Sequence, residues 1–363
     1  MEYGKGNVLL FTLEYPPFKG GVANVYGNVV KHWNSEIFVL TGDRLLKPHW
    51  FFALWHLYRA VKKHNIRTIL VGHILPLGTV TCWLAKFMSV RYVVFLHGMD
   101  FAQALKAGRK RRLARRILAS AERIIAMNGY TAALVQREFG NVIGTKVVVV
   151  NPGVTFTKQE NNPTLRRAGK TTKQLLEKYH LEGKKILLQV GRLVERKGYD
   201  KVLEALPAVI KEIQNLMYVI VGDGPQREAL QIINQKSSIK NHVIFITNAT
   251  DEEVEFWYEL CDIFIMPARN IDGDFEGFGI VYLEAGVHGK PVIAGDSGGV
   301  RDAVKNDLNG LLVNPESTPD IKDAILKLYH DEFLRRRLGQ RGREWAKSFA
   351  WEDKVSQIKK IVL

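Results

Sequence analysis

Short runs of aliphatic and β-branched residues alternate with longer polar or amphipathic stretches, and this alternation occurs twice along the chain. The first set of runs is NVLLFT, EIFVLT, RTILVGH, RYVVFLHG, RIIAM and KVVVVNPG. The second set is KILLQVGR, MYVIVGDG, VIFIT, DIFIMPA, PVIAG and GLLVNP. Each run has the length of a buried strand and precedes sequence that can form the helix of a parallel connection. The chain is therefore predicted to be α/β, with two Rossmann-like, doubly wound domains that face each other across a cleft.

A polar segment, TKQENNPTLRRAGKTTKQ, separates the two sets and has no apolar period, so it is interpreted as the connection between domains. The predicted domains are 1–165 and 166–346. Residues 347–363 are predicted to form a C-terminal helix that crosses back to the N-terminal domain. A length of 363 residues suits two such domains.

The positive charge is concentrated in the first domain. Residues 1–165 hold 22 Lys and Arg against 8 Asp and Glu, which accounts for nearly all of the formal net charge of +15. Such asymmetry indicates an anionic partner, either nucleic acid or acidic lipid. The two cysteines, Cys82 and Cys261, lie far apart, which fits a reducing cytoplasm. The N-terminus lacks signal-peptide features, and no apolar run reaches the roughly 18 residues of a membrane span.

A basic amphipathic helix is predicted within LKAGRKRRLARRILASAERIIAM. Nearby, KPHWFFALWHLYRAVKKH mixes aromatic side chains with cations, as helices seated in a membrane interface do. Solvated charges and core aromatics are the alternative interpretation. Because each cation near an anionic bilayer contributes about 1 kcal/mol, we expect peripheral attachment to the inner face of the plasma membrane. The cations expected at this acceptor and membrane face are Arg109, Lys110, Arg111, Arg112, Arg115 and Arg116.

Loops that follow the predicted strands carry the candidate site residues, because doubly wound sheets bind ligands at those strand ends. Gly20 and Gly21 precede a helix whose N-terminus can hold an anion, although a plain tight turn explains them equally well. His97 follows RYVVFL and, taken alone, is more often structural than catalytic. Arg192 and Lys197 flank one loop and suit a diphosphate, although a solvated surface loop is the alternative.

The stretch EGFGIVYLEAGVHGKPVIAG is the most informative of these loops. Glu276 precedes a predicted helix start at Gly277, Phe278 and Gly279, where free N–H groups and the helix dipole favour an anion. Glu284 lies further along that helix, where a carboxylate suits the hydroxyls of a ribose. A helix cap and an exposed residue would explain each glutamate alone but not the pair.

A DxD sequence, Asp272-Gly273-Asp274, could bind a divalent metal against a diphosphate. It lies in a glycine-rich loop just before Glu276, and Arg192 with Lys197 already supplies positive charge. We therefore expect no metal site and no cofactor.

At these residues the chain resembles the retaining glycosyltransferases of family 4, which have the GT-B fold. The resemblance rests on the Glu276 and Glu284 pair, the GR…KG cations, VGDGP, SGGVRDAV and FAWEDKV, in family order over nearly the whole chain. Within that family, the segment EGFGIVYLEA…PVIAG is similar to the corresponding segment of the phosphatidylinositol mannosyltransferases. The resemblance implies that Glu284 binds the donor ribose, and that Arg192 and Lys197 neutralise the departing diphosphate. It also implies that Glu276 and the following N–H groups hold sugar hydroxyls, that His97 faces the donor sugar, and that Gly20-Gly21 covers the phosphates.

The implied reaction moves a hexose from a nucleotide sugar to a hydroxyl of a lipid-linked or glycan acceptor, with retention of configuration. GDP-mannose is expected rather than UDP-glucose, although Thr247-Asn248 departs from the family near the expected base pocket. A UDP-dependent glucosyl- or N-acetylhexosaminyltransferase is the alternative within the same fold, and an epimerase and a sugar-phosphate synthase are further rivals. A nucleic-acid-binding protein would explain the charge, but no nucleic-acid-binding module is recognised in the sequence. Nucleic acid is therefore not expected as a partner.

Overall fold

The computed structural model describes residues 8–18, 20–42, 49–156 and 173–363. Its contacts divide the chain into two compact units. The first unit comprises Met1–Gly153 with Phe349–Leu363, and the second unit comprises Val154–Ser348. The division comes earlier than the boundary at 165/166 that the sequence suggested, and most of the polar connection lies outside the described residues.

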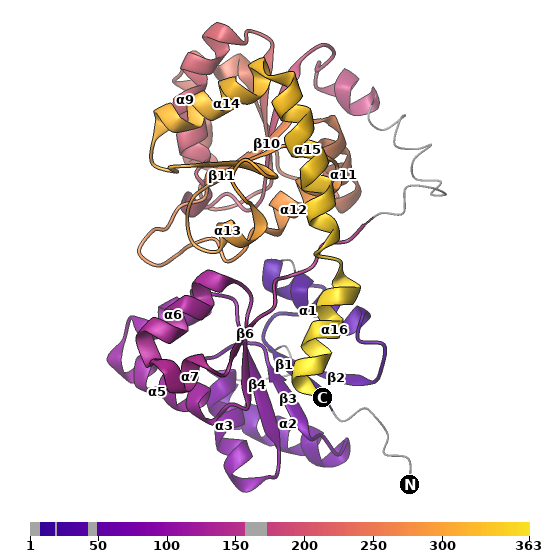
Figure 1. Ribbon diagram of the computed structural model, residues 1–363, viewed down its shortest axis with the longest axis vertical. Helices are drawn as coiled ribbons and strands as arrows, with labels where there is room; N and C mark the ends of the chain where they lie inside the picture. Colours follow the sequence, from indigo (N-terminus) through magenta and orange to yellow (C-terminus); the bar gives the residue numbers. More distant parts are fainter. Residues whose placement is uncertain (1–7, 19, 43–48, 157–172) are drawn as a thin grey trace. The chain divides into compact units, whose positions relative to one another are not determined.

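The first unit is built on a parallel sheet with strand order β2-β1-β3-β4-β5-β6 (Figure 1). Its strands are β1 (Val8–Thr12), β2 (Ile37–Thr41), β3 (Thr68–Val71), β4 (Arg91–Leu96), β5 (Arg123–Ala126) and β6 (Val147–Val149). Its helices are α1 (Gly21–Lys31), α2 (His49–Lys63), α3 (Leu77–Phe87), α4 (Met99–Leu105), α5 (Gly108–Ser120), α6 (Gly129–Phe139), α7 (Asn141–Gly144) and α16 (Trp351–Val362). The strand order reverses between β1 and β3, so the loops after these strands lie where such sheets bind ligands.

The second unit has a parallel sheet with strand order β12-β11-β10-β7-β8-β9. Its strands are β7 (Lys185–Val190), β8 (Leu216–Val221), β9 (Val243–Ile246), β10 (Ile263–Met266), β11 (Val292–Gly295) and β12 (Gly310–Val313). Its helical segments include η2 (Glu195–Lys197), α9 (Tyr199–Glu212), α10 (Arg227–Gln235), η3 (Lys240–His242), α11 (Asp251–Leu260), α12 (Ile280–Val287), α13 (Val300–Ala303), α14 (Thr318–His330) and α15 (Glu332–Lys347). Here the order reverses between β7 and β10.

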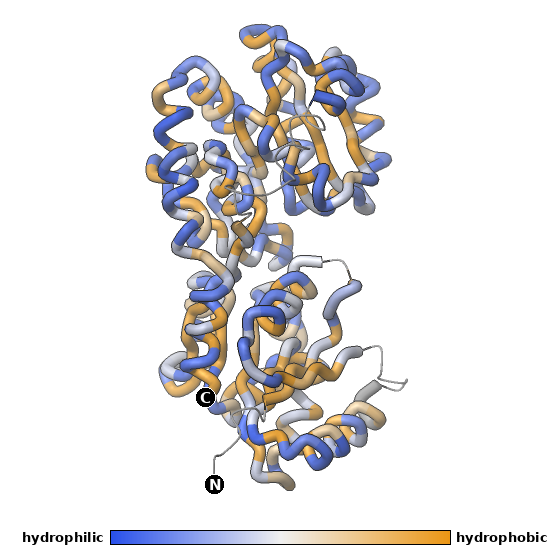
Figure 2. Tube along the Cα trace, turned by 90° about the vertical axis from the view of Figure 1, so that its right-hand side faces the viewer, coloured by the Kyte–Doolittle hydropathy of each residue, from blue (hydrophilic) through white to orange (hydrophobic). Residues whose placement is uncertain are grey.

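Each sheet is apolar along its strands and forms the centre of a separate hydrophobic core. Phe11, Val94 and Ile117 belong to the core of the first unit, and Leu203 and Ile265 belong to the core of the second. Figure 2 shows the strands of both units as largely hydrophobic segments. Parallel strands covered on both faces are expected to be continuously apolar. All of the apolar runs identified in the sequence form strands, which confirms the predicted α/β class with two doubly wound sheets.

The C-terminal helix α16 packs within the first unit. Trp351, Val355 and Ile358 are buried, and the helix contacts α1 and β5. A Cβ on Gly153 would lie 2.5 Å from the Trp351 ring, so only glycine lets the indole approach this closely. The segment that belongs to the first unit begins at Phe349.

The basic amphipathic helix predicted within LKAGRKRRLARRILASAERIIAM is α5. Helix α5 ends at Ser120, and Arg123 already begins β5. RIIAM forms a strand as predicted, and Ile124 and Ile125 are fully buried in the sheet, where β-branched side chains are favoured. In the described part of the chain, none of the helices combines the length and apolarity needed to span a membrane.

Candidate active site

Two cations meet a buried carboxylate where the strand order of the second unit reverses. Lys197, which ends η2 after β7, places Nζ 2.5 Å from Glu276 Oε2. Arg196 Nη1 lies 2.6 Å from the same oxygen, and its Nε lies 3.0 Å from Asp274 Oδ1. Lys197 and Glu276 are only 7% and 9% exposed. The site therefore contains a desolvated, multiply paired carboxylate rather than isolated surface charges.

The backbone around η2 fixes where Lys197 points. Gly198 adopts the left-handed conformation with φ 71°, and a Cβ there would clash with the carbonyl oxygen of Pro267. Gln189 donates from Nε2 to the carbonyl of Lys197 at 2.8 Å, and the N–H of Arg269 donates to the carbonyl of Arg196 at 2.8 Å. Hydrogen bonds from the β7 strand and the β10 loop therefore hold the turn between them.

Opposing effects act on the charges of this cluster. Burial raises the pKa of Glu276, but the nearby Lys197 and Arg196 more than offset that effect and bring it below its usual value. Burial lowers the pKa of Lys197, and Glu276 opposes that shift. Because two cations face the carboxylate, we take Glu276 to be ionised.

Arg192 does not take part in the ion pairs of this cluster. Its side chain is exposed, and within the described residues it makes no ion pair. Arg196, which the sequence analysis did not assign, is the arginine that contacts Glu276. The available signal was its place beside Lys197 in the ERKG segment.

Glu276 leads into α12, the helix that carries Glu284. Gly277 and Phe278 follow Glu276, and Gly279 is the N-cap of the helix, with φ 83°. The carbonyl of Glu276 accepts a hydrogen bond from the N–H of Gly299 at 2.9 Å, so the SGG turn lies beside it. The structure thus brings the loop after β10 and the turn after β11 together.

Glu284 is half-buried and held by a neighbouring helix. The hydroxyl of Tyr258 in α11 donates to Glu284 Oε2 at 2.8 Å. Burial raises the pKa of Glu284, and the hydrogen bond from Tyr258 opposes that rise. Sequence reasoning missed Tyr258, because nothing in the pattern of α11 distinguishes it from a core aromatic residue.

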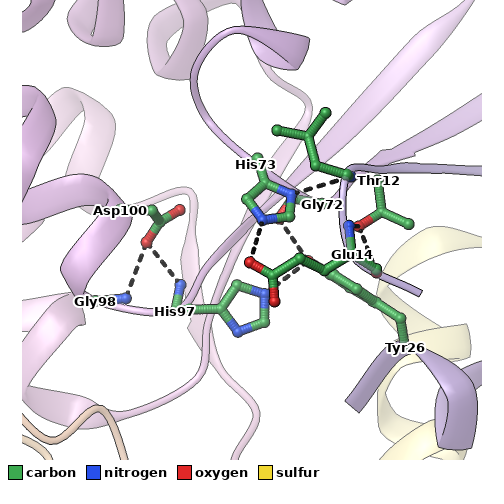
Figure 3. A network of polar contacts seen from close by, with 9 residues as sticks. Thr12, Glu14, Tyr26, Gly72, His73, His97, Gly98 and Asp100 are labelled. Atoms are coloured by element: carbon green, nitrogen blue, oxygen red, sulfur yellow. Dashed lines mark hydrogen bonds and ion pairs between the residues drawn. The ribbon is translucent and has the colours of Figure 1, made fainter. Parts of the chain in front are cut away.

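A second polar cluster lies in the first unit at the ends of β1, β3 and β4 (Figure 3). His97 Nε2 lies 2.7 Å from the hydroxyl of Tyr26, and that hydroxyl donates to the carbonyl of Gly72 at 2.7 Å. A phenol has only one proton, so Tyr26 accepts from His97, and His97 must carry its proton on Nε2. Burial, with the nearby His73, lowers the pKa of His97 to about 3. His97 is therefore neutral and presents Nδ1 as an acceptor.

His73 and Glu14 extend this cluster, and the sequence analysis assigned neither of them. His73 Nδ1 accepts from the N–H of Leu13 at 3.4 Å, and its Nε2 lies 3.6 Å from Glu14 Oε1 (Figure 3). Asp100 Oδ1 accepts from the N–H groups of His97 and Gly98 at 3.1 Å each and so fixes the start of α4. The loops after three strands thus carry hydrogen-bonding groups that converge on one edge of the sheet.

The two glycines after β1 stand at the start of α1. Gly20 is its N-cap with extended backbone, and nothing lies within 4 Å of a Cβ built on Gly21. A Cβ on Gly20 would lie 3.6 Å from Glu14 Oε2, so this loop adjoins the cluster of Figure 3.

Cations and aromatic side chains are exposed on α2, α3 and α5 of the first unit. An open hollow of about 580 Å³ is lined by Arg111, Arg112 and Arg115 together with Phe139. A second hollow of about 360 Å³ is lined by Trp83, Lys86, Leu113 and Arg116. The six cations that the sequence analysis assigned to a membrane face are all exposed: Arg109, Lys110, Arg111, Arg112, Arg115 and Arg116.

Residues that could bind a metal do not gather at the DxD sequence. Asp272 and Gly273 have positive φ in a turn, and Asp274 is paired with Arg196. Across the described ranges, no group of three or more His, Cys, Asp or Glu residues could hold a metal ion.

Each unit matches a known protein family. Residues 7–158 match Glycosyltransferase Family 4, and residues 172–345 match Glycosyl transferases group 1. A GDP-mannose-dependent alpha-(1-6)-phosphatidylinositol monomannoside mannosyltransferase of Mycobacterium tuberculosis is 27% identical, with 97% of this chain and 96% of that protein covered. The crystal structure of Anabaena HepE in complex with UDP has a TM-score of 0.81 at 16% identity, covering 98% of both chains. WaaG, a glycosyltransferase involved in lipopolysaccharide biosynthesis, has a TM-score of 0.73 at 18% identity, covering 98% of this chain and 99% of its own.

Proposed function

The chain belongs to the glycosyltransferases, with a family 4 region followed by a group 1 region, and has the GT-B fold; on that basis we propose that it is a retaining hexosyltransferase. In this proposal the enzyme moves mannose from GDP-mannose to a hydroxyl of a lipid-linked or glycolipid acceptor at the cytoplasmic face of the membrane. Family membership gives the reaction class.

The observation that carries the proposal is the ion pair of buried Lys197 and Glu276, with half-buried Arg196 beside it, at the switch point of the second unit. When the bond to the anomeric carbon breaks, negative charge grows on the diphosphate. A cation that is already desolvated and fixed in place stabilises that charge with little reorganisation. We expect Lys197, with Arg192 at the entrance of the same loop, to interact with the diphosphate.

The start of α12 supplies the remaining donor contacts in this proposal. Gly277, Phe278 and Gly279 lead into the N-terminus of the helix, where the positive end of the helix dipole favours anions and hydroxyl oxygens. Glu276 would accept hydrogen bonds from sugar hydroxyls, and Glu284 would accept them from the ribose. His97 would accept one through Nδ1, because its Nε2 proton is committed to Tyr26.

GDP-mannose is the proposed donor because of the named relatives. The Mycobacterium tuberculosis protein is GDP-mannose-dependent and aligns over nearly the whole chain. The UDP bound to Anabaena HepE keeps the UDP-sugar alternative open as an outcome of the test, since that likeness at 16% identity concerns the fold alone. Retention would follow from attack on the face that the diphosphate leaves, with that phosphate accepting the proton of the acceptor hydroxyl.

The proposed acceptor side lies on the basic first unit. Helix α5 exposes six cations, and Trp55, Trp83 and Phe87 are exposed on α2 and α3. Aromatic side chains beside cations suit a membrane interface, where the rings enter the headgroup region and the charges meet anionic lipid. We therefore propose peripheral attachment to the inner face of the plasma membrane.

Calorimetric titration of the full chain with GDP, UDP, ADP, GDP-mannose and UDP-glucose in EDTA tests the proposal. We expect GDP and GDP-mannose to bind without metal and to stabilise the folded chain by about 2.7 kcal/mol at a hundred times Kd. Selective binding of UDP would replace the mannosyl proposal by the UDP-sugar alternative. If no nucleotide binds, the transferase proposal fails. Comparing duplex DNA with anionic liposomes at equal salt would then decide between nucleic-acid and lipid binding.

A further inference from the structure

Only one of the two carboxylate oxygens of Glu284 is engaged within the described part of the protein. Oε2 accepts the hydroxyl proton of Tyr258 at 2.8 Å, and Oε1 has no hydrogen-bond partner there. A carboxylate can accept several hydrogen bonds, so Oε1 remains available to a ligand. The orientation of this oxygen depends on Tyr258.

Tyr258 is itself held firmly. Its side chain is completely buried and stacks on His288, with ring centroids 5.6 Å apart and planes at 14°. His288 Nε2 lies 2.9 Å from Glu255 Oε2, which fixes the far side of the stack. A buried ring that stacks on His288 and contacts Phe264 has little freedom, so its hydroxyl stays within hydrogen-bonding distance of Glu284 Oε2.

The helix that carries Glu284 is equally constrained. Helix α12 packs against α15 where Gly286 approaches Gly342, and a Cβ on Gly286 would lie 2.9 Å from the Gly342 carbonyl oxygen. Because this close packing fixes the backbones of α12 and α15, Glu284 can move only by rotation of its side chain. The hydrogen bond from Tyr258 restricts that rotation.

We propose that Tyr258 is a positioning residue that fixes which oxygen of Glu284 meets the ribose, and that this gives the donor site its preference for ribonucleotides over deoxyribonucleotides. The inference rests on the proposed function, because it takes Glu284 as the ribose-binding residue. Losing a hydrogen bond to a charged group costs binding, and a carboxylate that must first be ordered binds its ligand more weakly.

Binding of GDP, 2′-deoxy-GDP and 3′-deoxy-GDP to the full chain tests the inference by calorimetry without needing the acceptor, and the UDP series is run in parallel. Wild-type protein is expected to bind one ribonucleotide about 10- to 100-fold more tightly than at least one of its deoxy forms. Tyr258→Phe is expected to weaken ribonucleotide binding about 5- to 10-fold and to leave deoxynucleotide binding nearly unchanged. The ratio of the two affinities is therefore expected to fall.

Two further variants separate positioning from general damage to the fold. Tyr329→Phe removes a hydroxyl of the second unit that has no hydrogen-bond partner in the described residues, so it is expected to keep the wild-type preference. Glu284→Gln is expected to lose the preference, and adding Tyr258→Phe to it is expected to cost nothing more, because Tyr258 acts through Glu284.

The outcomes distinguish the two proposals. If wild-type protein discriminates and Tyr258→Phe discriminates equally, or if the two substitutions add, the inference about Tyr258 is wrong while the proposed function stands. If wild-type protein binds neither nucleotide series, the proposed function fails, and this inference fails with it.

Discussion

Lys197 is a cation that the fold keeps away from water. Its ammonium is paired with Glu276 at 2.5 Å, and its backbone carbonyl is tied to Gln189. Taking a charge out of water is costly, and a protein keeps such a group where the pairing compensates or where function needs it. Family membership and the position at the switch point favour function here.

Replacing Lys197 by alanine is expected to lower kcat by about 100- to 1,000-fold, because a fixed cation at the leaving group would be lost. The fold should survive, since Arg196 still pairs with Glu276. Steady-state kinetics and circular dichroism would check both parts. Lys236→Ala removes an exposed lysine of the same unit and should leave kcat unchanged. Near-normal turnover of Lys197→Ala would remove its proposed role, and Arg192→Ala tests the second predicted cation in the same way.

His97 offers a prediction about protonation. Its pKa in the folded chain lies at about 3, below the ordinary 6.5, because of burial and the neighbouring His73. The unfolded chain takes up a proton there near 6.5 while the folded chain does not, so His97 makes the protein less stable as pH falls from 6.5 toward 3.

Nitrogen NMR of histidine-labelled protein should find His97 neutral and protonated on Nε2 down to pH 5. His242 provides an internal reference, because its Nδ1 lies 2.8 Å from the Leu216 carbonyl and must be the donor. Tyr26→Phe should leave His97 as a mixture of tautomers. Titration of His97 near 6.5, or protonation on Nδ1 in wild-type protein, would contradict the proposed hydrogen-bonding role.

At the scale of single residues, the sequence indicated Arg192 and missed Arg196, the arginine that contacts Glu276. Arg192 and Arg196 flank the same loop, and only the 3-10 turn of η2 decides which one contacts Glu276. Tyr26, Tyr258 and His73 were not predicted, because each matters through a partner far away in sequence. Lys197, Glu276 and Glu284 stood out earlier because they occur in a strand-loop-helix pattern.

Helix α5 shows what a pattern can and cannot predict at the scale of an element. Its basic, amphipathic character was apparent, with Ala114, Ile117 and Leu118 buried beneath exposed cations. The residue at which it ends was not predicted, although RIIAM was identified as a strand and forms β5. Boundaries of this kind are set by tertiary packing.

Neutralising Arg109, Lys110, Arg111 and Arg112 to glutamine is expected to weaken binding to anionic liposomes at least tenfold at low salt, because each cation near the bilayer contributes about 1 kcal/mol. Arg111 contributes less, since Glu138 lies 3.0 Å away. Vesicle co-sedimentation measures the change, and nucleotide binding serves as the unchanged property. The matched control neutralises Arg336, Arg337, Arg341 and Lys347, which are exposed on α15 of the second unit. Equal losses in both variants would mean that the basic first unit has no special part in membrane binding.

For the whole molecule, the twofold alternation of strands and helices was sufficient to predict two doubly wound sheets, because each apolar run could only be buried in a parallel sheet. The order of the strands could not be predicted from it, since order depends on which helices cover which face. The division between units also differed from the polar segment. The chain leaves the first unit after Gly153, where Trp351 packs, so a contact with the far end of the sequence sets the boundary.

The packing of Trp351 against Gly153 predicts how the chain unfolds. Trp351→Ala removes a ring that is 3% exposed and should destabilise the first unit by roughly 3–5 kcal/mol. Hydrogen exchange should then rise in peptides covering β1, β5 and α1, while those covering β7 and β10 keep their protection, because the two cores are separate. Trp83→Ala, which removes a half-exposed ring of the same unit, should change stability by at most about 0.5 kcal/mol. An equal rise in exchange across both units would instead mean that the chain unfolds as one cooperative body, with α16 stabilising both cores together.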